Sequence, residues 1–356
     1  MNKASLMKKC LSLAKRAEGK TSPNPMVGAL LIKDGEIIAN DYHRKPGTPH
    51  AEALVLKQAG DRAKGASLFV TLEPCCHTNK RTPPCTNAII ASQIKDVFIA
   101  MLDPNPMVSG RGVDILKASG INVEIGILED EAKKLNEAYI KYITTKRPFV
   151  TLKIAMTLDG KIADPEGHSK WITCEESRKV VHRLRSASDG LLSAIGTVLA
   201  DNPSFTARIR GGIDPIRIII DPDLKTPDGF NVLKTPPPTI IVCKDGNPRS
   251  SILINNGIEI LTYKDKLDLN WLMEELGKRQ IMSILIEGGS TLAGHALEES
   301  IVDKVMFFIA PKIIRGKDSL TAIGGETFQK INEAHQLKEY KIKKIGSDFL
   351  IEGYLS

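Results

Sequence analysis

Apolar and polar positions alternate along the first 145 residues in a way that predicts helices and strands in regular succession. Apolar side chains recur at helical spacing over 5–18, and Asp34-Gly35 joins two β-branched runs as a hairpin turn does. The predicted strands are 27–33, 36–42, 67–71, 96–101 and 122–127, and the further helices are 50–59, 86–92, 112–118 and 130–142. This succession predicts a sheet of about five strands with helices on both faces.

The pattern restarts after a short polar segment, Thr144-Thr-Lys-Arg-Pro148. We therefore expect two domains, residues 1–145 and 146–356. In the second domain the pattern predicts a strand from residue 148, a helix to about Ala187 with a capping box at Thr173 and Glu176, and a second helix at 270–279. Further strands are predicted at 190–195, 217–220, 239–242, 258–261 and 283–287. The fold class is thus α/β throughout.

Composition indicates which cellular compartment and which partners to expect. Hydrophobic residues make up 42% of the 356, but no apolar run is long enough to span a membrane and the first residues lack the apolar centre of a signal peptide. We expect a cytoplasmic protein without a membrane partner. Three of the six cysteines are crowded into residues 75–85, a spacing that indicates metal binding rather than a disulfide framework.

The net charge of +7 does not indicate a nucleic-acid partner. Lys and Arg are scattered along the chain without a basic run, and aromatic residues make up only 5%. A dispersed, mild excess of positive charge favours solubility and a weak attraction for anionic small molecules.

The candidate metal site consists of His50, Cys75 and Cys85. One imidazole and two thiolates leave the fourth position of a tetrahedral zinc ion open, and an open position distinguishes catalytic from structural zinc. Glu52 follows His50 by two residues and is free to carry a proton, which is the division of labour in zinc deaminases. We also expect the positive end of helix 50–59 to help keep Glu52 ionised.

Two questions about this site stay open at the level of the sequence. We favour Cys75 as the ligand because it follows Glu73-Pro74 directly, but the adjacent Cys76 is an alternative. The metal would be purely structural if Cys76 or His77 supplied a fourth ligand.

Two residues near the metal are candidate substrate contacts. Asn24 lies just before the first strand, where ordinary turn chemistry is the alternative explanation. Arg81 lies in the polar loop before Cys85 and is a candidate phosphate ligand, with a solvated loop as the alternative.

The second half contains a candidate anion site at Glu287-Gly-Gly-Ser-Thr291. A strand that ends at Glu287, two glycines and a following helix present unpaired backbone N–H groups to a ligand. A plain turn is the alternative explanation. Arginines elsewhere in this half are suited to phosphate because a guanidinium binds it in a bidentate manner.

Four motifs of the first half, taken together, resemble a known family. They are Pro23-Asn-Pro-x-Val-Gly28, His50-Ala-Glu52, Thr71-Leu-Glu-Pro-Cys75 and Arg81-Thr-Pro-Pro-Cys85. This arrangement resembles the amino-terminal domain of bifunctional riboflavin-biosynthesis pyrimidine deaminase/reductases, which has a cytidine-deaminase-like three-layer fold. Nine residues separate Cys75 from Cys85, one more than in the family pattern.

Segments 153–160, 169–171, 196–201 and 285–290 resemble the carboxy-terminal reductase domain of the same family, which is similar in fold to dihydrofolate reductase. The resemblance implies zinc on His50, Cys75 and Cys85, with Glu52 as general acid and base. The implied NADPH contacts are Ala155, Trp171, Thr197, Asp201, Gly289, Ser290, Thr291, Leu292, Ala293, Gly294 and His295. The implied substrate contacts are Ser169, Arg185, Arg208 and Glu287, in addition to the candidates Asn24 and Arg81 named above.

The resemblance implies two consecutive reactions on a phosphorylated pyrimidine. A diaminopyrimidinone ribosylamine phosphate would first be deaminated hydrolytically at the zinc site, and its ribosyl group would then be reduced to ribityl by NADPH. We expect this small molecule as the partner, no nucleic acid, and a homo-oligomer.

Several alternatives remain beside this expectation. The chain could be a nucleic-acid base deaminase with an RNA-binding second half, although the low aromatic content speaks against it. Arg185 and Arg208 could form surface ion pairs, and Trp171 could belong to the core.

Overall fold

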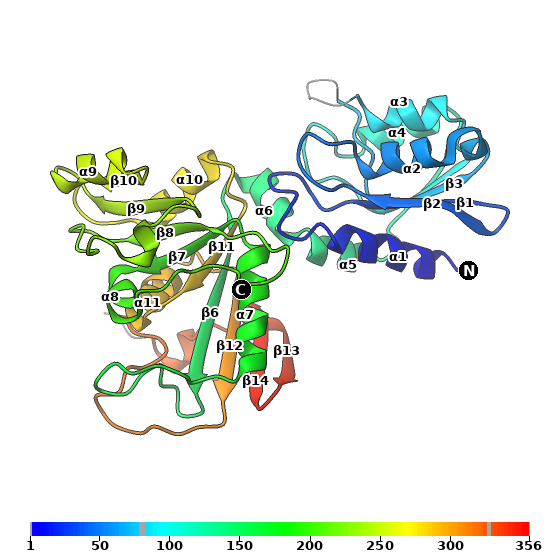
Figure 1. The fold of residues 1–356 in the computed structure, drawn as a ribbon. Helices are drawn as coiled ribbons and strands as arrows, with labels where there is room; N and C mark the ends of the chain where they lie inside the picture. The colour runs from blue at the N-terminus through cyan, green and yellow to red at the C-terminus, as the bar shows by residue number, and fades with distance from the viewer. Residues whose placement is uncertain (1, 78–82, 326–328, 356) are drawn as a thin grey trace. The chain divides into compact units, whose positions relative to one another are not determined.

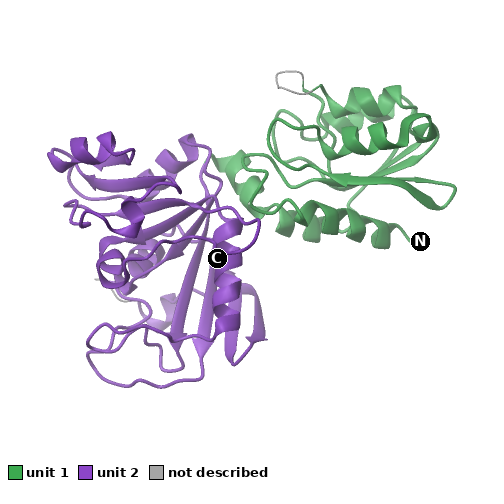
Figure 2. Ribbon diagram, in the orientation of Figure 1, with its two compact units in different colours: residues 1–146 green, residues 147–356 purple. Residues whose placement is uncertain are grey.

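The computed structural model describes residues 2–77, 83–325 and 329–355 and divides the chain into two compact units, Met1–Lys146 and Arg147–Ser356 (Figure 2). In the first unit the helices are α1 Lys3–Lys15, α2 Ala51–Ala59, α3 Cys85–Ala91, α4 Arg111–Ala118, α5 Glu129–Leu135 and α6 Glu137–Thr145. Its strands are β1 Gly28–Lys33, β2 Glu36–Tyr42, β3 Ser67–Leu72, β4 Asp96–Met101 and β5 Asn122–Ile125.

The strands of the first unit form one sheet in the order β2-β1-β3-β4-β5. β1 is antiparallel to both β2 and β3, whereas β3, β4 and β5 are parallel. Figure 1 shows α1 and α5 on one face and α2, α3 and α4 on the other. The five-stranded sheet between two helical layers agrees with the sequence pattern.

The predicted single helix 130–142 is wrong, because the chain forms α5 and α6 with a break at Asn136. The Asn136 side chain accepts a hydrogen bond from the Met26 N–H at 2.8 Å and donates one to the Met26 carbonyl at 3.0 Å. An Asn side chain that binds distant backbone competes with helix continuation. The local periodicity of residues 130–142 carries no trace of this contact.

The helices of the second unit are α7 Glu175–Ala187, α8 Ile195–Asp201, α9 Arg249–Asn255, α10 Leu269–Lys278 and α11 Ser290–Glu298. Its strands are β6 Phe149–Thr157, β7 Gly190–Ala194, β8 Ile216–Ile220, β9 Thr239–Lys244, β10 Glu259–Tyr263, β11 Ser283–Glu287, β12 Lys304–Ala310, β13 Leu337–Ile345 and β14 Asp348–Leu355. The sheet order is β10-β9-β8-β7-β11-β6-β12-β14-β13. Neighbours from β10 to β12 are parallel, and β14 is antiparallel to both β12 and β13.

Apolar side chains on both faces of this sheet are covered by helices. Leu192 and Ile218 belong to the core that includes Leu272 of α10, whereas the neighbouring Leu191 and Ile219 pack in the cluster on the opposite face. Successive residues of a strand point to opposite faces, so parallel strands covered on both sides read as continuous apolar runs.

The start of α7 differs from the prediction. The N-cap is Cys174, and the predicted capping box of Thr173 and Glu176 is not formed. Instead, Asp348 of β14 accepts hydrogen bonds from the Cys174 N–H at 2.8 Å and from the Ser177 hydroxyl at 2.6 Å. A carboxylate at a helix N-terminus is stabilised by the helix dipole, so a distant strand supplies the cap.

Five further elements were not predicted from the sequence pattern. Residues Ile195–Asp201 form helix α8, whereas the pattern extended the strand to 195. Helix α9 and the strands β12, β13 and β14 were not predicted at all. Of these, β13 is rich in polar residues, whereas β12 is an apolar run that was overlooked.

A buried carboxylate ties the end of β3 to the start of α4. Glu73 is 3% exposed and follows β3 directly. Its two oxygens accept four backbone N–H bonds, from Asp103 at 3.1 Å, Gly110 at 2.9 Å, Gly112 at 2.9 Å and Val113 at 3.2 Å. Glu73 therefore fixes the segment that carries Cys75 to the residues between β4 and the first turn of α4.

Replacing Glu73 tests this anchor. We predict that Glu73→Gln lowers the free energy of unfolding by about 3 kcal/mol, because the amide NH₂ faces backbone donors and leaves some of them without an acceptor. Urea unfolding of the full chain, followed by circular dichroism, measures the change. Glu131→Gln, an exposed carboxylate on α5, is the control and should have almost no effect. Equal stability of the two variants would contradict the anchor.

Candidate active sites

Three potential metal ligands meet in the first unit. His50 is the N-cap of α2, Cys75 follows β3 by three residues, and Cys85 is the first residue of α3. The His50 Nδ1 atom lies 3.4 Å from Cys75 Sγ and 3.3 Å from Cys85 Sγ. All three ligand atoms lie within 4.8 Å of one another. The structure thus brings together three residues that are up to 35 positions apart in the sequence.

The donor atoms fit a zinc ion. Tetrahedral zinc holds its nitrogen and sulfur ligands about 3.5 Å apart, close to the two distances measured here. Among the described residues, this group of potential ligands contains no fourth Cys, His, Asp or Glu. Cys76 lies outside the group and is half-buried. The arrangement is that of a zinc site with one position left for water or substrate.

Glu52 lies in the first turn of α2 and is 3% exposed. Burial, with the negative charge of Cys75 as a second cause, raises the pKa of Glu52 above its ordinary value. Burial and the expected field of the helix dipole therefore act in opposite directions on this group, and burial is the largest cause in the protein alone. The charge of a bound zinc ion acts in the opposite direction.

Asn24 is connected to the candidate metal ligand His50 through His43. Its side-chain NH₂ is 3.1 Å from His43 Nε2, and His43 Nδ1 is 3.2 Å from the Pro49 carbonyl. The pair of contacts requires the neutral His43 tautomer with its proton on Nδ1. The His43 ring also packs edge-on against the His50 ring, with centroids 5.3 Å apart. Arg81, the other predicted contact of this domain, lies outside the described residues.

A cavity of about 1440 Å³ opens in the second unit at the carboxyl ends of the parallel strands. Residues that follow or end β6, β7, β8 and β11 line it, together with α7, α8 and the N-terminus of α11. Ligand pockets of open α/β sheets lie at this edge. The volume exceeds the roughly 300–1,000 Å³ typical of a pocket for one small molecule. The cavity can therefore hold a cofactor and a substrate together.

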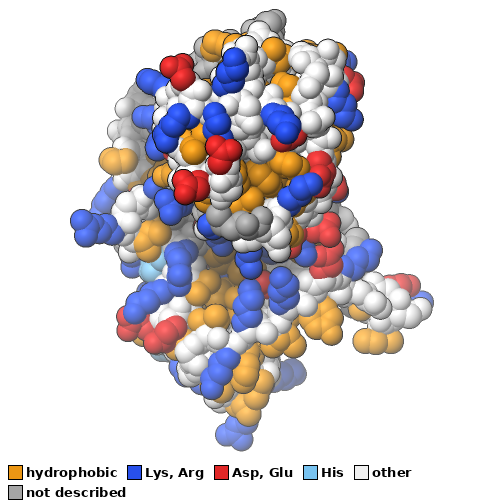
Figure 3. All heavy atoms as spheres, turned by 90° about the vertical axis from the view of Figure 1, so that its right-hand side faces the viewer, with side chains coloured by type: hydrophobic (Ala, Val, Ile, Leu, Met, Phe, Trp, Pro, Cys, Tyr) orange, Lys and Arg blue, Asp and Glu red, His pale blue; other side chains and the backbone are white. Residues whose placement is uncertain are grey.

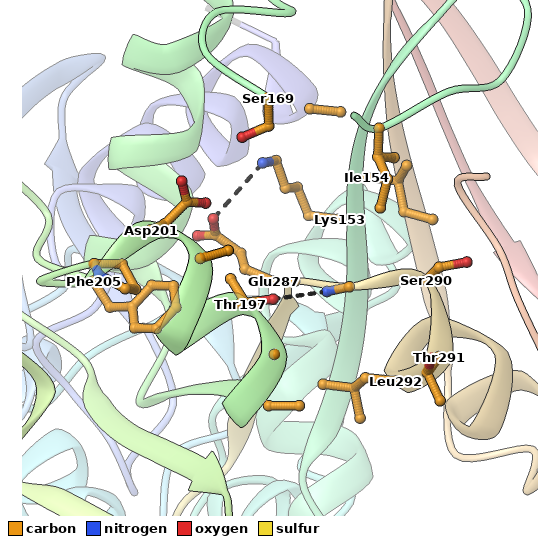
Figure 4. Close-up of a pocket in the computed structure, with 18 of the residues that line it drawn as sticks. Lys153, Ile154, Ser169, Thr197, Asp201, Phe205, Glu287, Ser290, Thr291 and Leu292 are labelled. Carbon is orange, nitrogen blue, oxygen red and sulfur yellow. Dashed lines mark hydrogen bonds and ion pairs between the residues drawn. The ribbon is translucent and has the colours of Figure 1, made fainter. Parts of the chain in front are cut away.

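A buried charge network forms one corner of the cavity. Glu287, at the end of β11, receives two hydrogen bonds from Arg185 of α7, at 2.7 and 2.9 Å. The Lys153 ammonium of β6 lies 3.7 Å from the same carboxylate, as the dashed line in Figure 4 marks. Burial opposes the ionisation of Glu287, but the charges of Arg185 and Lys153 hold its pKa at about 2. The carboxylate therefore stays ionised at neutral pH.

A second corner is suited to an anion. Gly288 has φ of +143°, and a Cβ there would lie 2.7 Å from Ser193 Oγ, so only glycine is accommodated. The following Gly289 N–H donates to Thr197 Oγ1 at 3.0 Å, and α11 begins at the next residue (Figure 4). The first turn of α11, whose N–H groups have no partner within the helix, lines the cavity, which makes this corner a candidate site for an anion.

Most of the predicted cofactor and substrate residues face this cavity. They are Ala155, Ser169, Trp171, Arg185, Thr197, Asp201, Arg208, Glu287, Gly289, Ser290, Thr291, Leu292 and His295. Ala293 and Gly294 lie on the buried side of α11 instead, Ala293 in the core and Gly294 against Gly324.

Two of the alternative explanations are wrong. Trp171 is 62% exposed and lines the cavity, so it does not belong to the core. Arg185 pairs with a buried carboxylate and not at the surface. Arg208 is exposed, and its Nε donates to the Thr206 hydroxyl at 3.3 Å.

Sequence reasoning missed several charged residues of the cavity. Lys153 interrupts an otherwise apolar and hydroxyl-bearing strand, which was a usable signal. Lys170 pairs with Asp201 at 3.0 Å, and Arg178 lies over the Trp171 ring at 4.5 Å from its centroid. No local pattern marked His182 of α7, which also lines the cavity.

Comparison with known proteins shows the family to which the chain belongs. Residues 1–101 match the family model described as the cytidine and deoxycytidylate deaminase zinc-binding region, and residues 148–351 match the RibD C-terminal domain. The riboflavin biosynthesis protein RibD of Aquifex aeolicus (strain VF5) is 45% identical over 347 residues, covering 97% of this chain and 96% of the relative. This chain belongs to the RibD family. RibD of Escherichia coli (strain K12) is 39% identical, with 96% of each protein covered.

Solved RibD structures have the same fold. Form 1 of Acinetobacter baumannii RibD has a TM-score of 0.91 at 36% identity, covering 99% of this chain and 98% of that one. A Thermotoga maritima protein has a TM-score of 0.89 at 37% identity with the same coverage, and is described as a diaminohydroxyphosphoribosylaminopyrimidine deaminase/5-amino-6-(5-phosphoribosylamino)uracil reductase. The predicted fold class, a cytidine-deaminase-like domain followed by a reductase domain, is confirmed.

As a member of the RibD family, the chain is a bifunctional deaminase and reductase of riboflavin biosynthesis, with zinc and NADPH as its cofactors. This identity excludes the structural zinc protein and the RNA-binding second half as overall descriptions. In the part of the chain that the structure describes, no helix has the length and apolar character required to span a bilayer.

Metal analysis of purified variants tests the ligand set. We predict one zinc per chain in the wild type and less than a tenth of that in Cys85→Ser and Cys75→Ser, because each removes one of three protein ligands. Cys76→Ser is the matched control and should keep its zinc. Loss of zinc from Cys76→Ser with retention in Cys75→Ser would instead make Cys76 the ligand. Elemental analysis by mass spectrometry measures the content.

Proposed function

We propose that the first unit deaminates 2,5-diamino-6-(5-phosphoribosylamino)pyrimidin-4-one and that the second unit reduces the ribosyl group of the product to ribityl. The substrates correspond to the activities for which the Thermotoga relative is named. The observation that carries the proposal is the pairing of the His50, Cys75 and Cys85 cluster with the buried Glu52 in one unit and the large charged cavity in the other.

In the first reaction, His50, Cys75 and Cys85 would hold zinc, which would supply a nucleophilic water at neutral pH. Glu52 would accept one proton of the attacking water and pass it to the pyrimidine ring, and would then carry the second proton from the added hydroxyl to the amine, which leaves as ammonia. The buried, raised-pKa carboxyl is suited to both accepting and donating a proton. Asn24, and Arg81 in the loop before Cys85, hold the substrate.

In the second reaction, the cavity would hold NADPH, which would supply the hydride for reduction of the ribosyl C1′. Thr197, Asp201, Ala155 and Trp171 contact the cofactor, together with the segment Gly289–His295, whose N–H groups face its pyrophosphate. Ser169, Arg185, Arg208 and Glu287 hold the phosphoribosyl substrate. Figure 4 supports this assignment, because Ser169, Lys153 and Glu287 face the same part of the cavity. The Lys153 ammonium is a proton donor in this corner.

We also infer the compartment and the partners. None of the six cysteines forms a disulfide within the described residues, in keeping with a reducing cytoplasm. On the face drawn in Figure 3, the described Lys and Arg side chains are interspersed with Asp and Glu, unlike a nucleic-acid-binding surface. The domains, residues 1–145 and 146–356, correspond to the two activities.

An exposed apolar face supports a homo-oligomer. Strand β13 is an edge of the second sheet. By the register of β13 with β14, Ile342 and Phe349 share one face, and they are 63% and 42% exposed. Apolar side chains grouped on an exposed sheet face indicate an interface, and a second copy of the chain is the partner we propose.

Replacing the general acid and base tests the first reaction. We predict that Glu52→Gln keeps its zinc but releases ammonia at least 100-fold more slowly, because the amide cannot move the proton. Supplied with the deaminated product directly, the same variant should oxidise NADPH at the wild-type rate. Ammonia release and NADPH absorbance are followed together.

The outcome separates the two halves of the proposal. Wild-type protein that releases no ammonia from the diaminopyrimidinone contradicts the assigned substrate. Ammonia release by Glu52→Gln at the wild-type rate contradicts the assigned residue.

Light scattering after size-exclusion chromatography tests the oligomer. We predict that the wild type elutes as a dimer or larger and that Ile342→Lys shifts it toward the monomer, because the charge is buried in the interface. Ile254→Lys, on the 55% exposed isoleucine of α9, is the control and should leave the mass unchanged. A monomeric wild type would contradict the proposal.

A further inference from the structure

Helix α7 presents a stripe of basic side chains to the reductase cavity. Arg178, His182 and Arg185 all line it, at positions i, i+4 and i+7 of the helix. Residues at this spacing share one face of a helix. Arg183, which follows His182 directly, is exposed and does not line the cavity. The basic stripe therefore lies on the face of α7 that is turned toward the cavity.

The two arginines of the stripe are engaged by protein groups. Arg185 pairs with both oxygens of Glu287 and also donates to the Thr206 carbonyl at 3.2 Å. Arg178 donates to the Thr173 carbonyl at 2.7 Å, and its guanidinium lies over the Trp171 ring. Much of their hydrogen-bonding capacity is used within the protein.

His182 differs from the two arginines. Its Nδ1 atom is buried and has no hydrogen-bond partner among the described residues. Buried polar atoms in proteins are normally hydrogen-bonded, and leaving one unpaired costs stability. The ring has a hydrogen bond with the Thr206 backbone, so Nδ1 is the nitrogen whose partner is to be sought in a ligand.

The charges around His182 select the kind of ligand. Arg185 lies on its own helix, Arg208 comes from the loop after α8, and Glu287 from β11, and all three act on its charge. Arg178 and Lys153 line the same cavity. Cationic donors beside an imidazole whose Nδ1 has no partner match a phosphate group.

We propose that His182 is a specificity-determining contact of the reductase site that recognises the phosphate of the phosphoribosyl substrate together with Arg208. The inference rests on the proposed function and adds to it a residue that the sequence did not indicate. The imidazole binds the phosphate in its protonated form, so substrate binding takes up a proton from solution.

The protonation of His182 explains how the contact depends on pH. Burial, followed by the charges of Arg185 and Arg208, lowers the pKa of His182 in the protein alone. A phosphate dianion beside the ring raises that pKa again, because it favours the cationic form. A phosphate monoester loses its second proton near pH 6. From about pH 7 upward its charge is constant, and affinity falls as His182 loses its proton.

The experiment compares His182→Ala, His182→Gln and His182→Lys with the control Arg183→Gln. Each is supplied with NADPH and either 5-amino-6-(5-phosphoribosylamino)uracil or its dephosphorylated analogue. We expect kcat/KM for the phosphorylated substrate to fall roughly tenfold or more in the Ala and Gln variants, the loss of one charge-assisted hydrogen bond. The dephosphorylated analogue should react equally with the wild type and these variants.

Two further readouts separate recognition from structure. Between pH 7 and 9, kcat/KM for the phosphorylated substrate should decline in the wild type and stay flat in His182→Lys, whose ammonium remains charged. His182→Lys should also regain most of the activity lost in His182→Ala. Ammonia release in the first reaction should be unchanged in all variants, which shows that the first unit is folded, and the unchanged reaction of the dephosphorylated analogue shows the same for the second unit.

The possible failures are distinguishable. Wild-type protein that does not oxidise NADPH with the phosphorylated substrate overturns the proposed function and this inference together. An active wild type with unchanged His182→Ala kinetics overturns the inference alone. A loss in His182→Ala that is equal for the two substrates also overturns it, because a structural role does not distinguish phosphate.

Discussion

Parallel pairing of strands is the constraint on which both active sites depend. Parallel neighbours bring their carboxyl ends to one edge of a sheet, and the segments that leave those ends carry the chemistry. In the first unit, Cys75 follows β3 and the Asp103 segment follows the parallel β4. In the second unit, Lys153 lies within β6 and Glu287 at the end of β11, paired in register. Side chains distant in sequence thereby become neighbours.

Buried carboxylates stabilise these edges, and they do so in different ways. Glu73 binds four backbone N–H groups and holds a loop, so its oxygens are fully used within the protein. Glu287 is balanced by two cationic side chains and still lines the cavity. Asp103 is held by Tyr139 at 2.9 Å, and burial raises its pKa to about 6. A buried charge is tolerated only when paired or hydrogen-bonded, so each of them fixes the position of the segment around it.

The candidate sites of the two units differ in size and in the elements that form them. In the deaminase unit the candidate metal ligands form a small group. His50 is the N-cap of α2, and Cys85 is the first residue of α3. The reductase unit instead surrounds a large cavity with side chains from several strands and helices. A metal supplies reactivity at one point, whereas a cofactor and a substrate must be oriented along their lengths, which requires an extended surface.

The sequence by itself determined the five-stranded sheet of the first unit, much of the order of the other elements and the residue types of the metal site, because these follow from local periodicity and from ligand chemistry. The motifs also indicated Thr197, Glu287 and the start of α11. Only the tertiary structure decided that Cys75 rather than Cys76 lies beside His50, that Asn136 breaks a helix, and that Asp348 caps α7. The same holds for Lys153 and His182 in the cavity wall. These features depend on contacts between segments more than a hundred residues apart, or on which way one side chain faces, and neither is encoded in a local pattern.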